Sequence, residues 1–270
     1  MTGFDAICHA LTTVATGGFA NYDSSFAHFE SHAIHWTAIV FMMLGAMPFV
    51  VFIRTLRGDR TAAWKDVQVR AFVGFLISVS LIMALWLLFT RNISFFDALT
   101  LSSFNVTSIV TTTGYMSDDY TRWGNFAVGV FFLLTFVGGC SGSTSGAIKI
   151  YRLQIAHMLT RSHFLHLISP SRVVTLTYNG RRLPADVPFS VVAFLAIYFA
   201  VVGLFAVIYA GLGLDFVTSL SASATALGNV GPGLGEIVGP AGNFVPIPDT
   251  AKWALSFQMM LGRLELFTVL

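Results

Sequence analysis

Residues 107–115, TSIVTTTGY, end a run that is too short to cross a membrane and too polar to be an ordinary core helix. The run begins near Phe96, with Asp97 predicted as its helix cap, and it is rich in hydroxyl side chains. A helix rises about 1.5 Å per residue, so the run covers about half of a ~30 Å hydrocarbon core and has to turn back. Unpaired carbonyls at that depth are tolerated only where they face protein or a water-filled path. The stretch therefore predicts a re-entrant pore loop.

The same pattern occurs three times along the chain, which indicates internal repeats. Phe4, Asp5 and Ala6 open a first run, as residues 96–98 open the second, and Asp215 opens a third. The residues that end these runs are the candidate filter residues: Thr16, Gly17 and Gly18; Thr112, Thr113 and Gly114; Asn229, Val230 and Gly231. The register stays open at two positions, because Gly17 competes with Gly18 and Gly228 competes with Gly231. We expect all three Asp residues to be helix caps and not ion ligands.

Composition places the chain in a membrane. Of its 270 residues, 55% are apolar and 10% are charged, against roughly 25% charged in a usual soluble domain. Apolar stretches at 36–53, 71–89 and 189–212 are long enough to span, and Gly45 and Pro48 are expected to bend the first. Cys8 and Cys140 lie too far apart in sequence to indicate a disulfide framework or a metal site.

A glycine-rich stretch interrupts the uncharged run at 123–148. Residues 138–146, GGCSGSTSG, are expected to unwind the helix at mid-membrane. A nucleotide-binding loop of the Walker A type is disfavoured, because Lys149 follows the last glycine by three positions in a helical context. Arg263 is a strong base inside an apolar run and is expected near the middle of the last helix.

The basic residues predict the orientation. The connectors 54–70 and 149–182 hold 11 of the 15 Lys and Arg residues, so we expect them on the cytoplasmic side. The pore loops then enter from outside. Their helix C-terminal ends point to the membrane centre, where partial negative charges favour a cation.

The motifs FDAICHALTTVATGGF, FNVTSIVTTTGY, GGCSGSTSGAIK and GNVGPGLG with GRLELFTVL resemble the superfamily of Trk, Ktr and HKT potassium transporters, most closely its TrkH-type membrane subunits. The resemblance implies an all-α integral membrane protein built of repeated helix, re-entrant pore loop, helix units around one ion pathway. Residues 1–56 would form an incomplete repeat, 67–168 a complete repeat with a broken inner helix, and 188–270 a repeat with a truncated inner helix. The first repeat of the family would be missing.

The resemblance further implies potassium uptake across the bacterial cytoplasmic (inner) membrane. Potassium would be the transported substrate and would bind at the filter only, and no cofactor is expected in this chain. The expected partners are membrane lipid, a second copy of the subunit in a homodimer, and a cytoplasmic nucleotide-binding regulatory subunit of the TrkA type, but no nucleic acid. The alternative is a secondary transporter of another cation, such as sodium, or of a small solute. An enzyme is not expected, because no catalytic constellation is assembled at one depth.

Several polar residues allow two interpretations. Asp118 and Asp119 suit either an outer ring that attracts cations or a solvated loop. His28, His32 and His35 have helical spacing and suit a metal site, although an interfacial polar patch is favoured. The resemblance implies a gating role for residues of the glycine-rich stretch and the last helix, namely Gly138, Gly139, Gly142, Gly146, Lys149 and Arg263. By the same resemblance Arg263 would be a barrier to cation leak, and the alternative is a buried ion pair. Replacing Arg263 with a neutral residue would distinguish these two interpretations.

Overall fold

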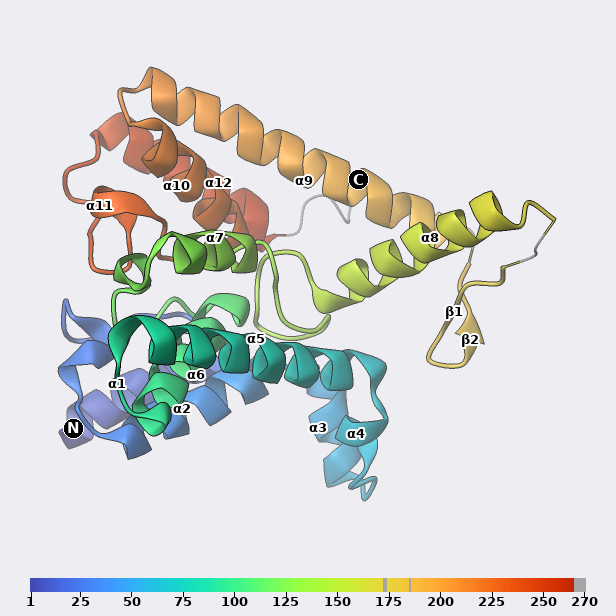
Figure 1. The fold of residues 1–270 in the computed structure, drawn as a ribbon, viewed down its shortest axis with the longest axis horizontal. Coiled ribbons are helices and arrows are strands. Elements are labelled where there is room, and N and C mark those ends of the chain that lie inside the picture. The colour runs from blue at the N-terminus through green and yellow to red at the C-terminus, as the bar shows by residue number, and fades with distance from the viewer. Residues whose placement is uncertain (172–173, 185, 265–270) are drawn as a thin grey trace.

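The computed structural model describes residues 1–171, 174–184 and 186–264, and these are almost entirely helical (Figure 1). The helices are α1 (Gly3–Val14), α2 (His32–Gly45), α3 (Phe49–Leu56), α4 (Ala62–Lys65), α5 (Val67–Arg91), α6 (Phe95–Val110), α7 (Asn125–Leu134), α8 (Ile150–Ile168), α9 (Asp186–Gly211), α10 (Phe216–Gly228), α11 (Gly235–Val238) and α12 (Asp249–Arg263). Short 3₁₀ turns occur at Ser25–His28 and Tyr120–Trp123. One addition to the all-α prediction is a small antiparallel hairpin of β1 (Thr177–Tyr178) and β2 (Arg181–Arg182). It turns at Asn179 and Gly180, which both have a positive φ.

Two helices, α5 and α9, are long and apolar enough to cross a membrane, and each contains a predicted span. The predicted bend also occurs, because α2 and α3 meet at 93° across a short break. Gly45 ends α2, and Pro48 precedes α3, where its missing N–H costs no helical hydrogen bond. The pair counts as a third span if it is taken as one bent helix.

The three predicted pore helices are the short helices α1, α6 and α10, with 12, 16 and 13 residues. Asp215 is an N-cap as expected. Asp5 and Asp97 also take part in capping, but they are not the N-cap residues, because Thr2 and Ser94 accept the capping bonds from their backbone amides. Each Asp instead completes a reciprocal pair at the third helical position, where its charge also suits the helix N-terminus.

The glycine-rich stretch does break the helix, because α7 stops at Leu134 and α8 begins at Ile150. A parallel bridge between Val137 and Ile148 brings the two sides of the break together. We refer to residues 138–146 between them as the intramembrane loop.

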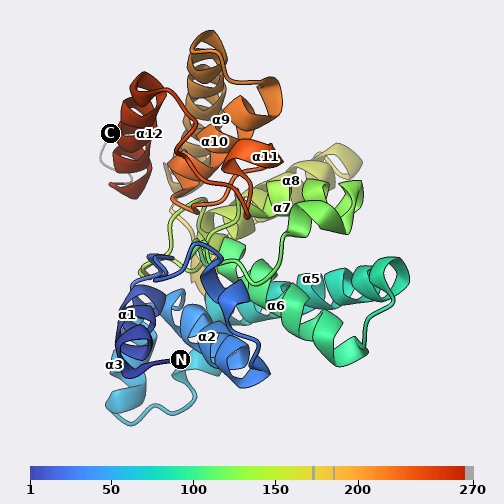
Figure 2. The ribbon, with the colours of Figure 1, turned by 90° about the vertical axis from the view of Figure 1, so that its left-hand side faces the viewer.

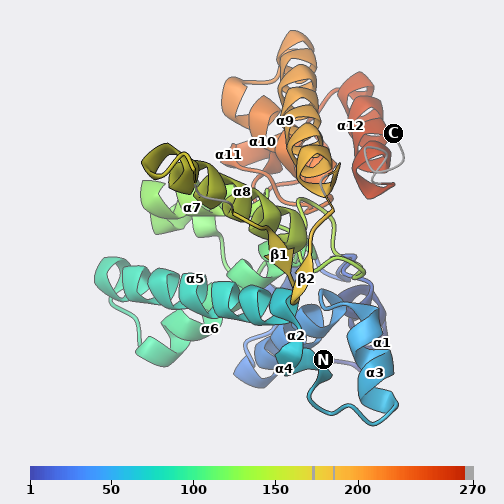
Figure 3. The same ribbon diagram turned by 90° about the vertical axis from the view of Figure 1, so that its right-hand side faces the viewer.

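The helices surround a central region in which the segments after α1, α6 and α10 meet. In the view of Figure 2, α1 to α3, α5 with α6, α7 with α8, and α9 with α10 and α12 follow one another around this centre. The N-terminus and α11 lie at one end of the molecule, and α3, α4 and the hairpin lie towards the other (Figures 1 and 3). Both basic connectors therefore lie at the same end, as a shared cytoplasmic side requires.

Candidate ion pathway

The three pore helices end in the same backbone conformation. A left-handed residue lies one or two positions after the last residue of each helix: Thr16, Thr112 and Asn229 have φ of 49°, 56° and 53°. The next amide bonds back five residues in each case: Gly17 to the Thr12 carbonyl, Thr113 to Ser108 and Val230 to Thr225, at 2.7, 2.9 and 3.0 Å. A β-branched threonine rarely adopts a positive φ, so this conformation is held by its surroundings.

A glycine with positive φ follows two positions after each left-handed residue. The φ angles of Gly18, Gly114 and Gly231 are 70°, 85° and 114°. Neither Gly17 nor Gly228 is among the positive-φ glycines. The backbone thus makes Gly18, Gly114 and Gly231 structurally equivalent and resolves the open register. We call residues 16–18, 112–114 and 229–231 the candidate filter segments.

These segments lie in backbone contact with one another. A Cβ on Gly18 would overlap the carbonyl oxygen of Thr113, and a Cβ on Gly114 would overlap that of Val230. At Gly231 the nearest atom would be the Gly114 Cα, at 3.6 Å. The first two glycines are therefore required by close packing as well as by their positive φ.

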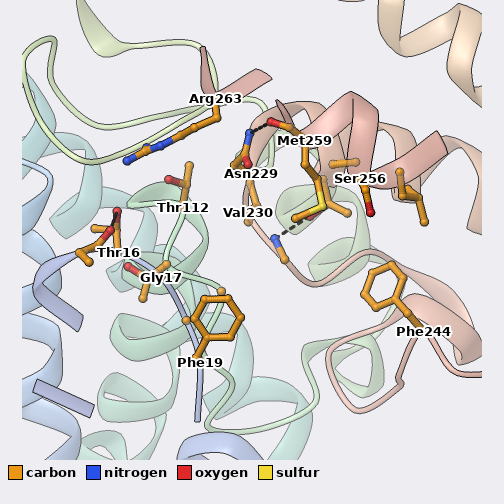
Figure 4. Close-up of a pocket in the computed structure, with 18 of the residues that line it drawn as sticks. Thr16, Gly17, Phe19, Thr112, Asn229, Val230, Phe244, Ser256, Met259 and Arg263 are labelled. Atoms are coloured by element: carbon orange, nitrogen blue, oxygen red, sulfur yellow. Dashed lines mark hydrogen bonds between the residues drawn. The ribbon is translucent and has the colours of Figure 1, made fainter. Parts of the chain in front are cut away.

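All nine residues of the candidate filter segments line one cavity of about 570 Å³ (Figure 4). α12 forms another part of the wall through Lys252, Leu255, Ser256 and Met259. The charged side chains among the described lining residues are those of Lys252 and Arg263, and no carboxylate is among them. Oxygen ligands for a cation in this cavity would therefore come from backbone carbonyls and hydroxyls.

Arg263 lies across one end of the cavity, over Thr112 and towards Thr16 (Figure 4). Its Nη1 donates to the carbonyl oxygen of Thr144 in the intramembrane loop at 2.5 Å. The expected mid-helix position was wrong, because α12 ends at Arg263. There a cation meets the negative end of the helix dipole. Glu265, the other ionisable residue expected in this helix, lies outside the described residues.

The intramembrane loop is hydrogen-bonded to the bend between α2 and α3. Cys140 N donates to the Ala46 carbonyl at 2.9 Å, and Phe49 N donates to the Gly142 carbonyl at 3.0 Å. The Thr144 hydroxyl donates to the Gly45 carbonyl at 3.0 Å. These hydrogen bonds hold the backbone of the glycine-rich sequence in a defined position against helices that are distant in sequence.

The candidate gating residues within and beside this loop have separate structural roles. Gly138 N donates to the Ile148 carbonyl at 2.8 Å, and Gly139 N donates to the Ser145 hydroxyl at 2.8 Å. Gly142 adopts a φ of 78°. Gly146 packs so closely against α10 that a Cβ would overlap the Gly228 carbonyl oxygen. Lys149 is buried, and its Nζ donates to the Ser145 carbonyl.

Tyr115 is a supporting residue that the sequence reasoning did not single out. Its buried hydroxyl bonds to the hydroxyls of Thr12 and Thr13 on α1, the second at 3.1 Å. Ser108 donates to the Tyr115 carbonyl at 2.7 Å. The second filter segment is thereby tied to the first pore helix. No local sequence pattern predicts a hydrogen bond between residues about a hundred positions apart.

Asp118 and Asp119 form ion pairs instead of a free ring of charge. The Arg91 guanidinium and the Trp123 indole both donate to the Asp118 carboxylate at 2.7 Å. Arg122 pairs with Asp119 at 3.2 Å. Asp118 thus holds the loop between the second filter segment and α7 against the end of α5, and Asp119 forms its ion pair within that loop.

The three histidines have separate partners. His28 stacks on Tyr22, His32 lies 3.3 Å from the Asp97 carboxylate, and His35 bonds to the Phe26 carbonyl. In the described part of the chain, no group of three His, Cys, Asp or Glu residues could hold a metal ion.

Asp5 fixes the chain that leaves the first filter segment. Asn21 Nδ2 donates to its carboxylate at 2.9 Å and the Tyr22 hydroxyl donates at 3.2 Å, while Thr2 donates from its amide and hydroxyl. These bonds, led by that from Asn21, hold the pKa of Asp5 well below its usual range.

The family model described as a cation transport protein, TrkH, matches residues 1–270. The chain belongs to the TrkH family. It is therefore a multi-pass membrane protein of a transport family and not of an enzyme family.

Individual relatives agree with this TrkH assignment. The chain is 51% identical to the Trk system potassium uptake protein TrkI of Halomonas elongata in an alignment of 271 positions, which covers all of this chain and 55% of the relative. It is 35% identical to the Trk system potassium uptake protein TrkH of Vibrio parahaemolyticus, covering all of this chain and 56% of that protein. The chain spans about half the length of these curated relatives.

The fold of the chain also matches a solved TrkH structure. The crystal structure of the potassium transporter TrkH from Vibrio parahaemolyticus superimposes with a TM-score of 0.93 at 34% identity. The match covers all of this chain and 58% of that one.

Proposed function

We propose that the chain forms part of a potassium uptake pathway, in which the three candidate filter segments bind dehydrated potassium through their backbone carbonyls. The observation that carries this proposal is the convergence of three equivalent left-handed segments, each ended by a positive-φ glycine, on one cavity. Carbonyl rings that replace the water shell of an ion are an established way to select potassium.

The charges around the cavity support carbonyl binding over a carboxylate site. The C-terminal ends of three helices contribute partial negative charge there. Because the described lining residues include no Asp or Glu, proton or sodium coupling through a carboxylate in this cavity is disfavoured. A further set of carbonyls would come from a repeat outside this chain. The names of the relatives, which are potassium uptake proteins, support the choice of ion.

The domain organisation and the gate are parts of the same proposal. Residues 1–56, 67–168 and 188–270 would be consecutive repeats, the second with its inner helix broken by the intramembrane loop. That loop and Arg263 would close the inner end of the pathway. The basic connectors would face the cytoplasm of a bacterial cell and receive a nucleotide-binding regulatory subunit of the TrkA type, and the transporter would work as a homodimer.

The test is ion uptake by a full-length transporter that contains this chain, in cells that lack their own potassium uptake. We expect rubidium uptake that potassium inhibits much more strongly than sodium does. Equal inhibition by sodium, or no uptake by protein that reaches the membrane, would contradict the proposal.

A further inference from the structure

The candidate filter and the intramembrane loop meet at one side chain, that of Thr112. Gly146 N donates to the Thr112 hydroxyl oxygen at 2.7 Å, and the Ser145 hydroxyl lies 3.3 Å from the same oxygen. Thr112 and Ser145 are 2% and 1% exposed, so water has little access to replace either partner. A buried amide that loses its acceptor is costly, and this bond therefore resists separation of the loop from the filter.

The same hydroxyl bond acts on the filter backbone. Thr112 is left-handed, a conformation that a β-branched residue adopts only under constraint. The hydrogen bond that the Thr112 hydroxyl oxygen accepts from Gly146 N fixes the rotamer of this side chain and helps to hold that conformation. Relaxation of Thr112 would reorient its own carbonyl and the carbonyls of Thr113 and Gly114, which line the cavity.

The two equivalent positions are bonded differently. The Thr16 hydroxyl donates to the adjacent Ala15 carbonyl at 2.8 Å, within its own turn. The Asn229 side-chain amide donates to the Met259 carbonyl of α12 at 3.0 Å. Of the three left-handed residues, Thr112 is the one whose side chain holds the intramembrane loop.

Other contacts tie this end of the loop to neighbouring elements. Ala147 N donates to the Gly228 carbonyl at 3.0 Å, next to the third filter segment, and Arg263 donates to the Thr144 carbonyl. A displacement that clears the loop from the pathway must therefore break the bond to Thr112 while it breaks these contacts.

We propose that the Thr112 hydroxyl couples the filter to the intramembrane loop, so that potassium in the filter and the docked loop stabilise each other. Thr112 is then a positioning residue through its hydroxyl, in addition to offering its carbonyl to the ion. The inference rests on the proposed function. The coupling is reciprocal: if bound potassium strengthens docking of the loop by a given factor, release of the loop weakens potassium binding by the same factor.

The test is amide hydrogen exchange of residues 138–147 in the purified full-length transporter, with potassium or choline as the cation. In the wild-type protein, potassium is expected to slow exchange at Gly146 about fivefold or more, the lower end of typical coupling factors. In Thr112→Val, which keeps the shape but removes the hydroxyl, the difference is expected to fall below about twofold, while Thr112→Ser retains it. Thr90→Val on α5 is the matched control, because it removes a hydroxyl that donates within its own helix, to the Trp86 carbonyl at 2.8 Å, and it retains the potassium effect on the loop.

Potassium binding is measured in the same samples by the potassium-dependent shift in melting temperature. If wild-type protein binds potassium and loop exchange does not respond, the coupling is refuted and the proposed function stands, whether or not Thr112→Val folds. If Thr112→Val binds potassium and keeps the full response, Thr112 is refuted as the coupling residue. Absence of potassium binding in the wild-type protein would overturn both proposals.

Discussion

Gly114 lies so close to Val230 that a Cβ on the glycine would overlap the carbonyl oxygen of the valine. Gly18 has the same relationship to Thr113. In both pairs the obstacle is backbone, so rotation of a side chain cannot relieve the overlap. The candidate filter segments therefore set one another's positions, and a substitution in one is expected to displace the next.

Gly114→Ser is expected to lower potassium over sodium discrimination about tenfold or more, because the new Cβ displaces the Val230 carbonyl and a φ of 85° disfavours a side chain. Competition of sodium with rubidium uptake measures the change. Gly74→Ser on α5, where a Cβ would meet nothing within 4 Å, is the control. Unchanged discrimination in Gly114→Ser would remove this glycine from the filter.

Arg263→Gln is expected to raise cation flux about fivefold or more, because removing a barrier of 1 kcal/mol or more changes a rate by about that factor. The increase should be larger at low ionic strength, where the charge is less screened. Flux into proteoliposomes at two salt concentrations measures it, and Arg263→Lys should retain the wild-type rate. A well-folded Arg263→Gln protein with unaltered flux would show that Arg263 is not a barrier.

Gly139→Val is expected to loosen the intramembrane loop and to raise flux in the absence of the nucleotide that the proposed regulatory subunit would bind. An added Cβ would lie 2.8 Å from the Ala46 carbonyl oxygen, so the loop has to move away from the bend between α2 and α3. Gly129→Val on α7 is the matched control, because a Cβ there would meet nothing within 4 Å. If both variants keep the wild-type dependence on nucleotide, the loop is a packing element and not a gate.

Tyr115→Phe is expected to weaken discrimination between potassium and sodium severalfold and to cost about 1 kcal/mol of stability, the usual contribution of one hydrogen bond. The hydroxyl that it removes ties the second filter segment to Thr12 and Thr13 of α1. Ion competition and thermal unfolding are measured together. A loss of stability without any change in ion competition would leave Tyr115 a role in folding only.

Asn21→Ala is expected to destabilise the protein in a pH-dependent way. The folded-state pKa of Asp5 is lowered, so its contribution is fully present above the ordinary carboxyl pKa of about 4 and is lost as pH falls through the folded value. The difference in melting temperature between wild type and variant should therefore be largest near pH 7 and shrink below about pH 4. A difference that is independent of pH would show that Asn21 acts without the Asp5 carboxylate.

Local patterns in the sequence were sufficient for most elements of the fold. The spans at α5 and α9 follow from apolar length, and the bend before α3 follows from Gly45 and Pro48. The N-caps Thr2 and Ser94 were missed because an Asp, which is also a preferred N-cap residue, follows each of them by three positions. Both residues belong to one reciprocal motif, which the spacing alone was enough to reveal.

Contacts between separate helices and loops could not be predicted in this way. The bond between Gly146 and Thr112 joins residues 34 positions apart, and that between Tyr115 and Thr13 spans 102. Each depends on how separate helices pack. The ion pair of Asp118 with Arg91 is of the same kind, since the sequence showed an acidic loop but not the base that α5 brings to it.

The left-handed position at the foot of the candidate filter holds Thr, Thr and Asn in the three repeats, with one backbone shape and different side-chain partners. An ion that is coordinated by backbone carbonyls does not contact the side chains that hold this backbone in place. A pore assembled from four identical subunits would have to repeat every anchor around its axis. A single polypeptide is free of that symmetry, so its pore segments can keep one backbone shape while their side chains hold different parts of the chain.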